Sequence, residues 1–348
     1  MTRASFLIPG DLSLPTGGYA YDRRILGMLS ARDVDVAHVE LSASFPNPTD
    51  ADLVETAEIV GALPREAVLL IDGLAYGAMP AELIREFDRP IVALCHHPLA
   101  MEAGLSLERS AELKASEIAA LAFAREVIVT SPATSAILIQ DFGVEPNRIT
   151  VAPPGTDPAP RARGSGSPFQ LLAVGSIVPR KGYDVLVRAL EKTDSQDWHL
   201  NIAGADDRSP RTAAELRDLI SALGLAQRVT LNGAVSDERL AELYAKADLF
   251  VMSSLFEGYG MVLAEAMARG LPIVSTTGGA AAETVPDAAA IKVPPGDVSA
   301  FAEALRTILR DSALRAQMAN ASWRAGRALP KWEDTTRIIA DVIRKAST

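Results

Sequence analysis

The sequence predicts an α/β fold of two doubly wound, Rossmann-like domains in series, and three observations carry this prediction. Short apolar or β-branched runs alternate with helical-period segments along the whole chain, which is typical of βαβ units and parallel sheets. Six such runs precede a segment rich in Pro, Gly and Ser at residues 153–168, and six follow it. A length of 348 residues exceeds one ordinary core and favours two domains.

The expected strands are short and apolar, as strands covered on both faces of a parallel sheet are. We therefore predict one domain at 1–160, a second at 161–328 and a final segment, 329–348, that contains a helix. In the first half the expected strands are 5–8, 34–41, 67–71, 90–95, 126–130 and 148–152, and in the second half 169–174, 199–203, 228–231, 249–252, 272–275 and 289–293.

Composition and charge exclude several classes of protein. Hydrophobic residues make up 48% and charged residues 22%, which is a globular composition. A net charge of −10 and only 5% aromatic residues argue against nucleic-acid binding. The single cysteine, Cys95, excludes an intrachain disulfide and fits a reducing compartment. No apolar run has the length of a signal peptide core or a membrane span, so we expect a cytoplasmic protein.

The segment 256–270, FEGYGMVLAEAMARG, carries the strongest chemical signal. Gly258 and Gly260 permit close approach of a ligand to the backbone. A helix is expected from Met261, and the free N–H groups of its first turn form an anion site suited to a diphosphate. Glu257 and Glu265 flank this helix start, placed to bind hydroxyl-rich groups. The alternative interpretation is an ordinary loop with a glutamate favoured by the helix dipole.

The segment 174–183, VGSIVPRKGY, places two cations after the first strand of the second half. A glycine turn at the carboxyl end of a strand, followed by Arg180, Lys181 and a helix from about Asp184, is typical of a phosphate-binding turn. The spacing is not that of a P-loop. The alternative is a pair of surface charges.

Two further turns lie at strand ends in the first half. The strand 90–95 runs into His96 and His97, where an open α/β sheet has its ligand crevice. The alternative is a pair of capping or packing histidines, and a metal is not expected because adjacent residues of an extended segment point to opposite faces. Gly17 and Gly18 follow the first strand and open a helix, which is a weak signal alone.

Two Asp-x-Asp pairs match the spacing used by metal-dependent sugar transferases, but neither has the context of a metal site. Asp33 and Asp35 lie between a helix and the start of a strand, and Asp50 and Asp52 lie in the first turn of a helix. No metal site is predicted.

The segments together resemble the retaining glycosyltransferases of family 4, which have the GT-B fold of two facing Rossmann-like domains with a cleft between them. The most specific element is E-x7-E, here Glu257 to Glu265, followed by a G-x-P-[IV]-V strand at 270–274 and a Gly-Gly…Glu element at 278–283. The resemblance covers essentially the whole chain. It implies that the domain at 1–160 binds the acceptor, that the domain at 161–328 binds the nucleotide-sugar donor, and that the terminal helix at 329–348 crosses back onto the first domain.

The resemblance also implies residue roles. Lys181 matches the lysine that binds the donor diphosphate, and Ser176 replaces the family's arginine five positions before it, with Arg180 as the substitute contact. Glu257 matches the acid beside the donor sugar, and Glu265 matches the acid that binds ribose. Neutralising the departing diphosphate then falls to the cations and the helix N-terminus, because no metal is expected.

In the first domain, His96 matches the histidine near the sugar, with His97 as a one-residue alternative, and Val235 of the second domain falls in the nucleobase loop. The expected catalytic residues are His96, Glu257 and Lys181. The expected donor-binding residues are Gly17, Gly18, Ser176, Arg180, Lys181, Val235, Gly258, Tyr259, Gly260, Met261, Val262 and Glu265.

The resemblance implies a retaining, metal-independent enzyme without a cofactor that moves a sugar from a nucleotide-diphosphate-sugar to a hydroxyl acceptor. Residues 1–160 carry a net charge of −11 and the helix expected at 105–125 is balanced in sign, so a small or glycan acceptor is favoured over a lipid and membrane association is not favoured. Alternatives are a glycolipid-forming enzyme on a neutral lipid, a GT-B nucleotide-sugar epimerase and a non-catalytic binding protein. A nicotinamide dehydrogenase is disfavoured because no GxGxxG follows a strand.

Overall fold

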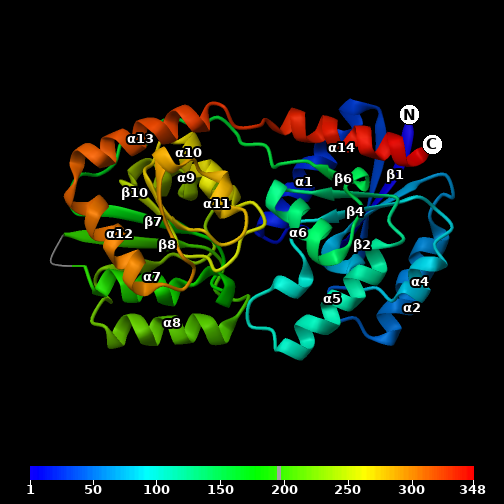
Figure 1. The fold of residues 1–348 in the computed structure, drawn as a ribbon, viewed down its shortest axis with the longest axis horizontal. Helices are drawn as coiled ribbons and strands as arrows, with labels where there is room; N and C mark the ends of the chain where they lie inside the picture. Colours follow the sequence, from blue (N-terminus) through cyan, green and yellow to red (C-terminus); the bar gives the residue numbers. More distant parts are fainter. Residues whose placement is uncertain (194–196) are drawn as a thin grey trace. The chain divides into compact units, whose positions relative to one another are not determined.

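Each half of the chain folds around a parallel β-sheet in the computed structural model, which describes residues 1–193 and 197–348 (Figure 1). The first unit comprises Met1–Gly155 and Pro330–Thr348, and the second comprises Thr156–Leu329. The first boundary lies five residues before the position expected from the sequence, and the second lies one residue after it. At Gly155 the chain passes so close to the returning segment that a Cβ would overlap the backbone of Trp332.

The sheet of the first unit is parallel throughout its described strands, because every connection crosses over through a helix. Its strands in spatial order are β2 (Val34–Leu41), β1 (Thr2–Pro9), β3 (Val68–Asp72), β4 (Ile91–Cys95), β5 (Glu126–Val129) and β6 (Ile149–Val151). Its helices are α1 (Gly17–Leu29), η1 (Ser30–Arg32), α2 (Asp50–Ala62), α3 (Gly73–Tyr76), α4 (Ala81–Arg85), η2 (Leu99–Met101), α5 (Leu107–Leu121), α6 (Pro132–Phe142), η3 (Pro146–Arg148) and α14 (Trp332–Ser347).

The sheet of the second unit is also parallel. Its strands in spatial order are β12 (Ala290–Val293), β11 (Ile273–Thr276), β10 (Leu249–Met252), β7 (Phe169–Val174), β8 (Trp198–Ala203) and β9 (Val229–Leu231). Its helices are η4 (Pro179–Lys181), α7 (Tyr183–Glu191), α8 (Pro210–Ala222), α9 (Asp237–Lys246), α10 (Met261–Ala268), α11 (Ala281–Thr284), η5 (Asp287–Ala289), α12 (Val298–Arg310) and α13 (Ser312–Gly326).

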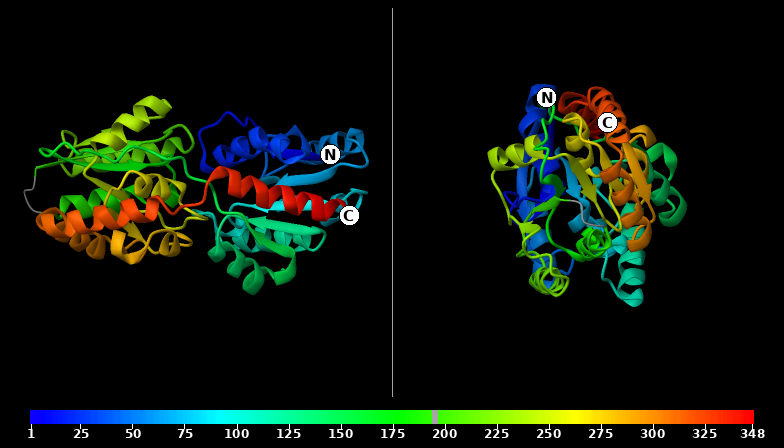
Figure 2. Two further views of the ribbon diagram at one scale, coloured as in Figure 1. Left: turned by 90° about the horizontal axis from the view of Figure 1, so that it is seen from above. Right: turned by 90° about the vertical axis from the view of Figure 1, so that its left-hand side faces the viewer.

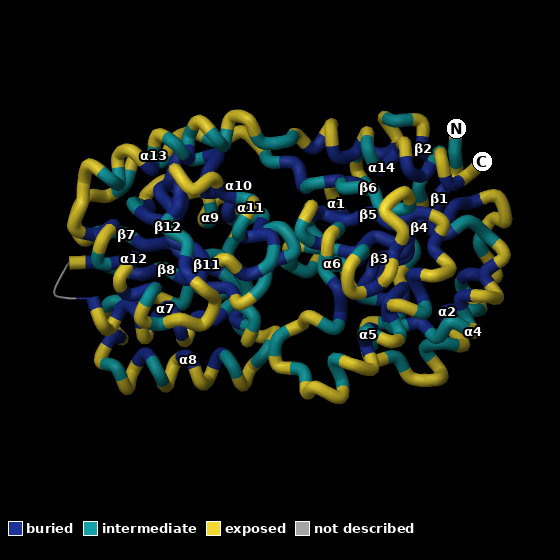
Figure 3. Tube along the Cα trace, in the orientation of Figure 1, coloured by how far each residue is buried: buried dark blue, intermediate teal, exposed yellow. Residues whose placement is uncertain are grey.

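Alternation along the strands supplies a core on each face of the second sheet. Leu171 and Ala173 of β7 point into one apolar cluster, and Leu172 between them points into another. The central strands are therefore apolar on both faces, which explains why their sequence reads as continuous hydrophobic runs. Buried residues follow the strands in Figure 3, whereas exposed residues line the outer turns of α8.

Helix α14 returns the chain to the first unit and packs against α1 and against strands β1, β3, β4 and β5 (Figure 2). The buried positions Trp332, Ile339 and Ile343 lie on one stripe of the helix. Lys345 forms an ion pair with the buried Glu126 of β5, with 2.7 Å between Nζ and Oε1.

All twelve expected strands are present among the described residues, with end points that differ by a few positions; β1 begins at Thr2 rather than residue 5. The helix expected at 105–125 is shorter, because Ser106 caps its start and it ends at Leu121. The helix expected from about Asp184 begins at Tyr183. Within the described residues, no helix is long and apolar enough to cross a membrane.

Candidate functional site

Glycines shape the turn after β7, and this turn packs against the loop that follows β10. Gly182 adopts the left-handed conformation (φ 58°), and a Cβ there would come within 2.5 Å of the Ser253 carbonyl oxygen. The Tyr183 hydroxyl donates to the Gly175 carbonyl at 2.8 Å, and the Ser253 hydroxyl donates to the Lys181 carbonyl at 2.9 Å. The turn that carries Arg180 and Lys181 is therefore fixed against the loop that follows β10.

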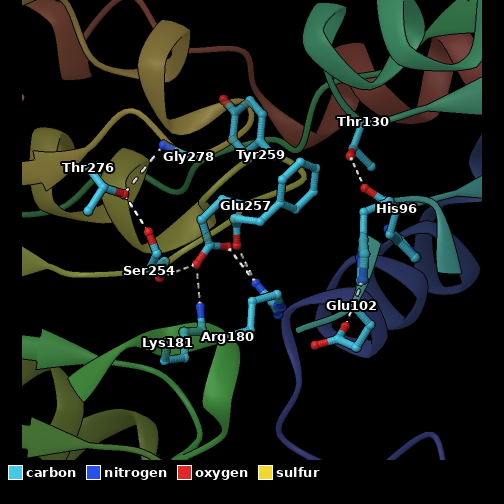
Figure 4. Close-up of polar contacts among 12 residues, drawn as sticks. His96, Glu102, Thr130, Arg180, Lys181, Ser254, Glu257, Tyr259, Thr276 and Gly278 are labelled. Atoms are coloured by element: carbon cyan, nitrogen blue, oxygen red, sulfur yellow. Dashed lines mark hydrogen bonds and ion pairs between the residues drawn. The ribbon is translucent and has the colours of Figure 1, made fainter. Parts of the chain in front are cut away.

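Glu257, Lys181 and Arg180 form a charge cluster in the second unit (Figure 4). Lys181 Nζ donates to Glu257 Oε1 at 2.7 Å, and the Ser254 hydroxyl donates to the same oxygen at 2.6 Å. Arg180 Nη1 lies 3.4 Å from Glu257 Oε2 and donates to the Phe256 carbonyl at 2.8 Å. The sequence analysis predicted that both cations bind phosphate and that Glu257 binds hydroxyl groups. In this structure the two cations bind Glu257.

Burial and the two cations oppose each other at Glu257. Burial alone raises the pKa of this carboxyl, but the charges of Lys181 and Arg180 and the hydrogen bonds from Lys181 and Ser254 outweigh it, and the pKa falls to about 2. Glu257 is therefore ionised throughout the physiological range. An acid this firmly ionised accepts hydrogen bonds and balances positive charge, and it does not act as a general acid.

Helix α10 presents its N-terminus without a side-chain cap. Gly260 takes the N-cap position in a left-handed conformation (φ 83°), and no side chain caps the first turn. Leu263 N–H donates to the Gly260 carbonyl at 2.8 Å, and within the described part of the chain the N–H groups of Met261 and Val262 have no hydrogen-bond partner. The helix starts at the residue predicted from the sequence, and an uncapped helix start is a kind of site that can bind an anion.

Glu265 lies one turn further along α10 and is held from the side. Its Oε2 accepts a hydrogen bond from the Tyr244 hydroxyl at 2.9 Å, and the Arg269 guanidinium lies 4.2 Å from the centre of the Tyr244 ring. Burial raises the pKa of Glu265, and the Tyr244 hydrogen bond acts in the opposite direction. Among the described residues, the Tyr244 hydroxyl is the hydrogen-bond donor found for this carboxylate.

The other predicted residues of the second unit lie in the loops after β7, after β9 and before α10. The carbonyl of Tyr259 accepts from the Thr284 hydroxyl at 2.6 Å, and burial raises the pKa of the Tyr259 phenol to about 12. Gly258 lies between Glu257 and Tyr259 in the loop before α10, Ser176 is half-buried in the turn after β7, and Val235 packs at the edge of an apolar cluster in the loop after β9.

In the first unit, the glycine loop and His96 meet. Thr16 caps α1 through its hydroxyl, which accepts from Tyr19 N–H at 3.2 Å. A Cβ on Gly18 would lie 3.3 Å from the His96 ring, whereas a Cβ on Gly17 would meet open space. The two glycines therefore differ. Gly18 leaves space for the imidazole ring of His96, whereas the space beside the Cα of Gly17 is open.

His96 is held by two buried carboxylates that sequence reasoning missed. Its Nε2 lies 3.1 Å from Asp22 Oδ1 and 3.4 Å from Asp72 Oδ2, and the Thr130 hydroxyl donates to the His96 carbonyl at 3.2 Å. Asp22 lies on α1, four residues after Gly18, and Asp72 ends β3, the neighbour of the histidine strand. An aspartate one helical turn after the glycine loop and an aspartate at the end of the neighbouring strand were the sequence features that could have predicted these partners of His96.

Burial alone lowers the pKa of His96, but the charge of Asp22 and the hydrogen bonds to both carboxylates raise it to about 10. Burial raises the pKa of Asp22 to about 6 against the lowering effect of His96. The ligand-type atoms of His96, Asp22 and Asp72 lie within 4.8 Å of one another, a spacing that suits a small cation. A protonated Nε2 would donate to both carboxylates and would have no lone pair for a cation.

His97, the alternative histidine, points elsewhere. Its Nε2 lies 2.9 Å from Oε2 of the partly exposed Glu102, five residues along the chain. The sequence argument that adjacent residues of the strand end face opposite directions fits this geometry.

A third buried acid that the sequence analysis missed lies under the His96–His97 segment. Glu117 of α5 is buried, its Oε2 accepts from Leu99 N–H at 3.0 Å, and its Oε1 lies 4.0 Å from the Cys95 sulfur. Burial raises the pKa of Glu117 to about 8, so the carboxyl is largely protonated at neutral pH.

A cavity of about 180 Å³ opens beside α9 in the second unit. It is lined by residues of β7, β8 and α9, including His199, Asn201 and Arg239, and contains none of the predicted site residues.

Two family models match the chain. The family described as "Glycosyl transferases group 1" matches residues 159–324, and the family described as "Glycosyltransferase Family 4" matches residues 69–160. The first match contains the whole charge cluster and α10, and the second contains His96.

A D-inositol 3-phosphate glycosyltransferase of Xylanimonas cellulosilytica is 32% identical over 228 residues, which are 60% of this chain and 54% of that protein. The chain matches between 38% and 68% of the length of the first curated relatives.

Two solved structures share the fold. A sucrose-phosphate synthase from Thermosynechococcus elongatus has a TM-score of 0.84 at 23% identity, and the match covers 99% of both chains. The Anabaena protein Alr3699/HepE, solved in complex with UDP and glucose, has a TM-score of 0.80 at 20% identity over 99% of this chain and 100% of that one. These similarities show a GT-B fold, as the sequence predicted.

Proposed function

Because the chain belongs to the glycosyltransferases of group 1 and family 4, we propose that it moves a sugar from a nucleotide-diphosphate-sugar to a hydroxyl group of an acceptor. The observation that carries the proposal is the charge cluster of Glu257, Lys181 and Arg180 in the same unit as an uncapped helix N-terminus at Met261. The two cations and the uncapped N–H groups at the start of α10 are donors of the kind that bind a diphosphate.

Lys181 is the proposed diphosphate ligand. An ammonium group has three N–H donors, and in this structure one of them goes to Glu257, so two are left for phosphate oxygens. Glu257 thereby holds Lys181 in place while its own charge limits the cost of burying the cation. Arg180 supports the same cluster in a chain that has Ser176 where the family has arginine.

Transfer leaves negative charge on the departing diphosphate, and preorganised donors stabilise that charge. Lys181 and the N–H groups at the start of α10 would supply this stabilisation, and Glu265 would bind the ribose through its uncommitted oxygen. Both oxygens of Glu257 are engaged by cations and Ser254, which makes it a poor nucleophile. Retention of anomeric configuration would then proceed by front-face attack of the acceptor, without a metal and without a cofactor.

In the first unit, we assign His96 to the donor sugar and the unit itself to the acceptor. A small molecule or a glycan fits the acidic charge of this unit better than an anionic lipid surface does. A neutral lipid is the alternative acceptor. A vesicle flotation assay separates the two, since strong salt-insensitive co-flotation with transfer to lipid alone would establish the lipid.

A panel of nucleotide sugars tests the proposal. We expect one donor to raise the melting temperature of the full chain by mass action, and we expect release of nucleoside diphosphate to require an acceptor. A sugar isomerised without any acceptor would favour the epimerase instead. Failure of every donor to bind would contradict the proposal.

A further inference from the structure

The His96 ring is clamped at one nitrogen only. Nε2 lies between Oδ1 of Asp22 at 3.1 Å and Oδ2 of Asp72 at 3.4 Å. Nδ1 has no hydrogen-bond partner among the described residues and is not among their buried, unpartnered atoms. The side chain as a whole is 20% exposed, so Nδ1 is the nitrogen that reaches solvent or a ligand.

The two carboxylates fix the tautomer. If Nε2 were unprotonated, its lone pair would face two acceptor oxygens in a buried site, which is strongly unfavourable. Asp22 and Asp72 are 0% and 2% exposed, so water does not relieve that contact. A proton on Nε2 that both oxygens share is therefore the arrangement that the geometry favours.

Neither carboxylate can turn away. Oδ1 of Asp72 accepts from Leu74 N–H at 2.8 Å, which makes Asp72 the N-cap of α3 and leaves Oδ2 toward the ring. Asp22 lies inside α1, and its Oδ2 is buried without a partner, so among the described residues its side chain hydrogen-bonds only to His96. A buried carboxylate with one partner depends on the positive charge of that partner.

The remaining charged and titratable neighbours do not compete for the ring. Tyr21 of α1 packs edge-on against it at 5.3 Å between ring centres and donates its own hydroxyl to the Ala152 carbonyl. The charge of Arg23 lowers the pKa of Asp22. Burial and the charges of Glu117 and Asp72 raise the pKa of the Cys95 thiol, at the end of β4.

We propose that Asp22 and Asp72 are positioning residues that keep His96 as an imidazolium, with its Nδ1–H turned outward as a fixed cationic donor to an oxygen of the substrate. The assignment of substrate rests on the function proposed above, whereas the protonation state does not. His96 in this role binds and stabilises negative charge, and it does not accept a proton from the acceptor. Asp22 contributes more than Asp72, because its contact is shorter and has no second partner.

Nitrogen-detected NMR of the histidine rings in the full chain tests the protonation state directly. The chain has four histidines, and loss of one signal set in His96→Gln assigns the ring. We expect both nitrogens of His96 to carry protons at neutral pH and to titrate only in strongly basic solution. In Asp22→Asn the midpoint should fall by about 1–3 pH units, since one opposite charge has been removed.

Asp141→Asn is the matched control, because Asp141 is exposed on α6 of the same unit and should leave His96 unchanged. Asp72→Asn, which retains a cap oxygen for α3, should lower the midpoint by a smaller amount and keeps the test open if Asp22→Asn does not fold. A neutral His96 ring at pH near 7, or an unchanged midpoint in both variants, would overturn the proposal. Perturbation of the ring signals by zinc or manganese, lost in Asp22→Asn, would overturn it in favour of a metal site.

Where turnover is detected, the basic limb of the kcat/KM profile should move to lower pH in Asp22→Asn but not in Asp141→Asn. A loss of rate without a change in the profile would indicate a merely structural role and would contradict the positioning role. If no nucleotide sugar is turned over, the function proposed above fails while the NMR result still decides the state of His96.

Discussion

Replacing Glu257 by Gln removes a buried negative charge that is paired with both Lys181 and Arg180. The carboxylate is nearly buried, with 8% of its side chain exposed, and it accepts from Lys181 at 2.7 Å and from Ser254 at 2.6 Å. The amide keeps the shape and one acceptor oxygen, but it removes the negative charge that faces both cations. The free energy of unfolding of the second unit should therefore fall, without a change of fold.

The magnitude follows from the pKa of Glu257, about 2 in the folded chain against 4.5 for an ordinary glutamate. A difference of about 2.5 pH units corresponds to about 3 kcal/mol, which agrees with the roughly 3–5 kcal/mol cost of breaking a buried ion pair on one side. Because the folded pKa is the lower one, this stability is present above pH 4.5 and is lost as pH falls through about 2.

Urea unfolding followed by tryptophan fluorescence measures the effect, since Trp198 is buried in the second unit. We expect Glu257→Gln to be about 3 kcal/mol less stable than wild type at neutral pH, with a gap that closes as the solution becomes acid. Glu283→Gln, an exposed glutamate in the same unit, should show no gap. A gap that stays constant down to about pH 2.5 would refute the electrostatic reasoning.

Three further predictions address the other sites. Relative to wild type, Glu117→Gln should become more stable as pH rises from about 5 to about 9. The folded pKa of Glu117 is about 8, above the ordinary 4.5, so the wild-type protein loses stability as pH rises through 8. Parallel curves of unfolding free energy against pH, measured in urea, would disprove this. Glu265→Ala should weaken nucleoside diphosphate binding in calorimetry while circular dichroism stays unchanged, and unchanged affinity would remove Glu265 from the ribose site. EDTA should leave transfer intact, and a complete loss that manganese restores would rule out the metal-free mechanism.

The strands could be predicted from the sequence because each is a short apolar run between turn residues, and burial on both faces imposes that pattern. The start of α10 at Met261 could also be predicted, since Gly258 and Gly260 end the preceding loop and an apolar, alanine-rich helix follows. These are local features, encoded within a few residues.

The side-chain partners could not be predicted in the same way. Asp22 and His96 are 74 residues apart, and only the β1–β3–β4 order of the first sheet brings α1 and the end of β3 to the histidine. Lys181 and Glu257 are 76 residues apart, and their pairing depends on the close approach at Gly182. The sequence identified the residues of the charge cluster but not that they bind one another.

Calorimetric titration of nucleoside diphosphates into the full chain in EDTA tests the central claim most directly. We expect one diphosphate to bind wild type and Lys246→Met alike, since Lys246 is an exposed lysine of the same unit. Binding to Lys181→Met, measured well below its unfolding temperature, should be at least about tenfold weaker, because a charge-assisted hydrogen bond contributes roughly 1.5–3 kcal/mol. Equal affinity of wild type and Lys181→Met, or no binding of any nucleoside diphosphate to wild type, would contradict a diphosphate site at the start of α10.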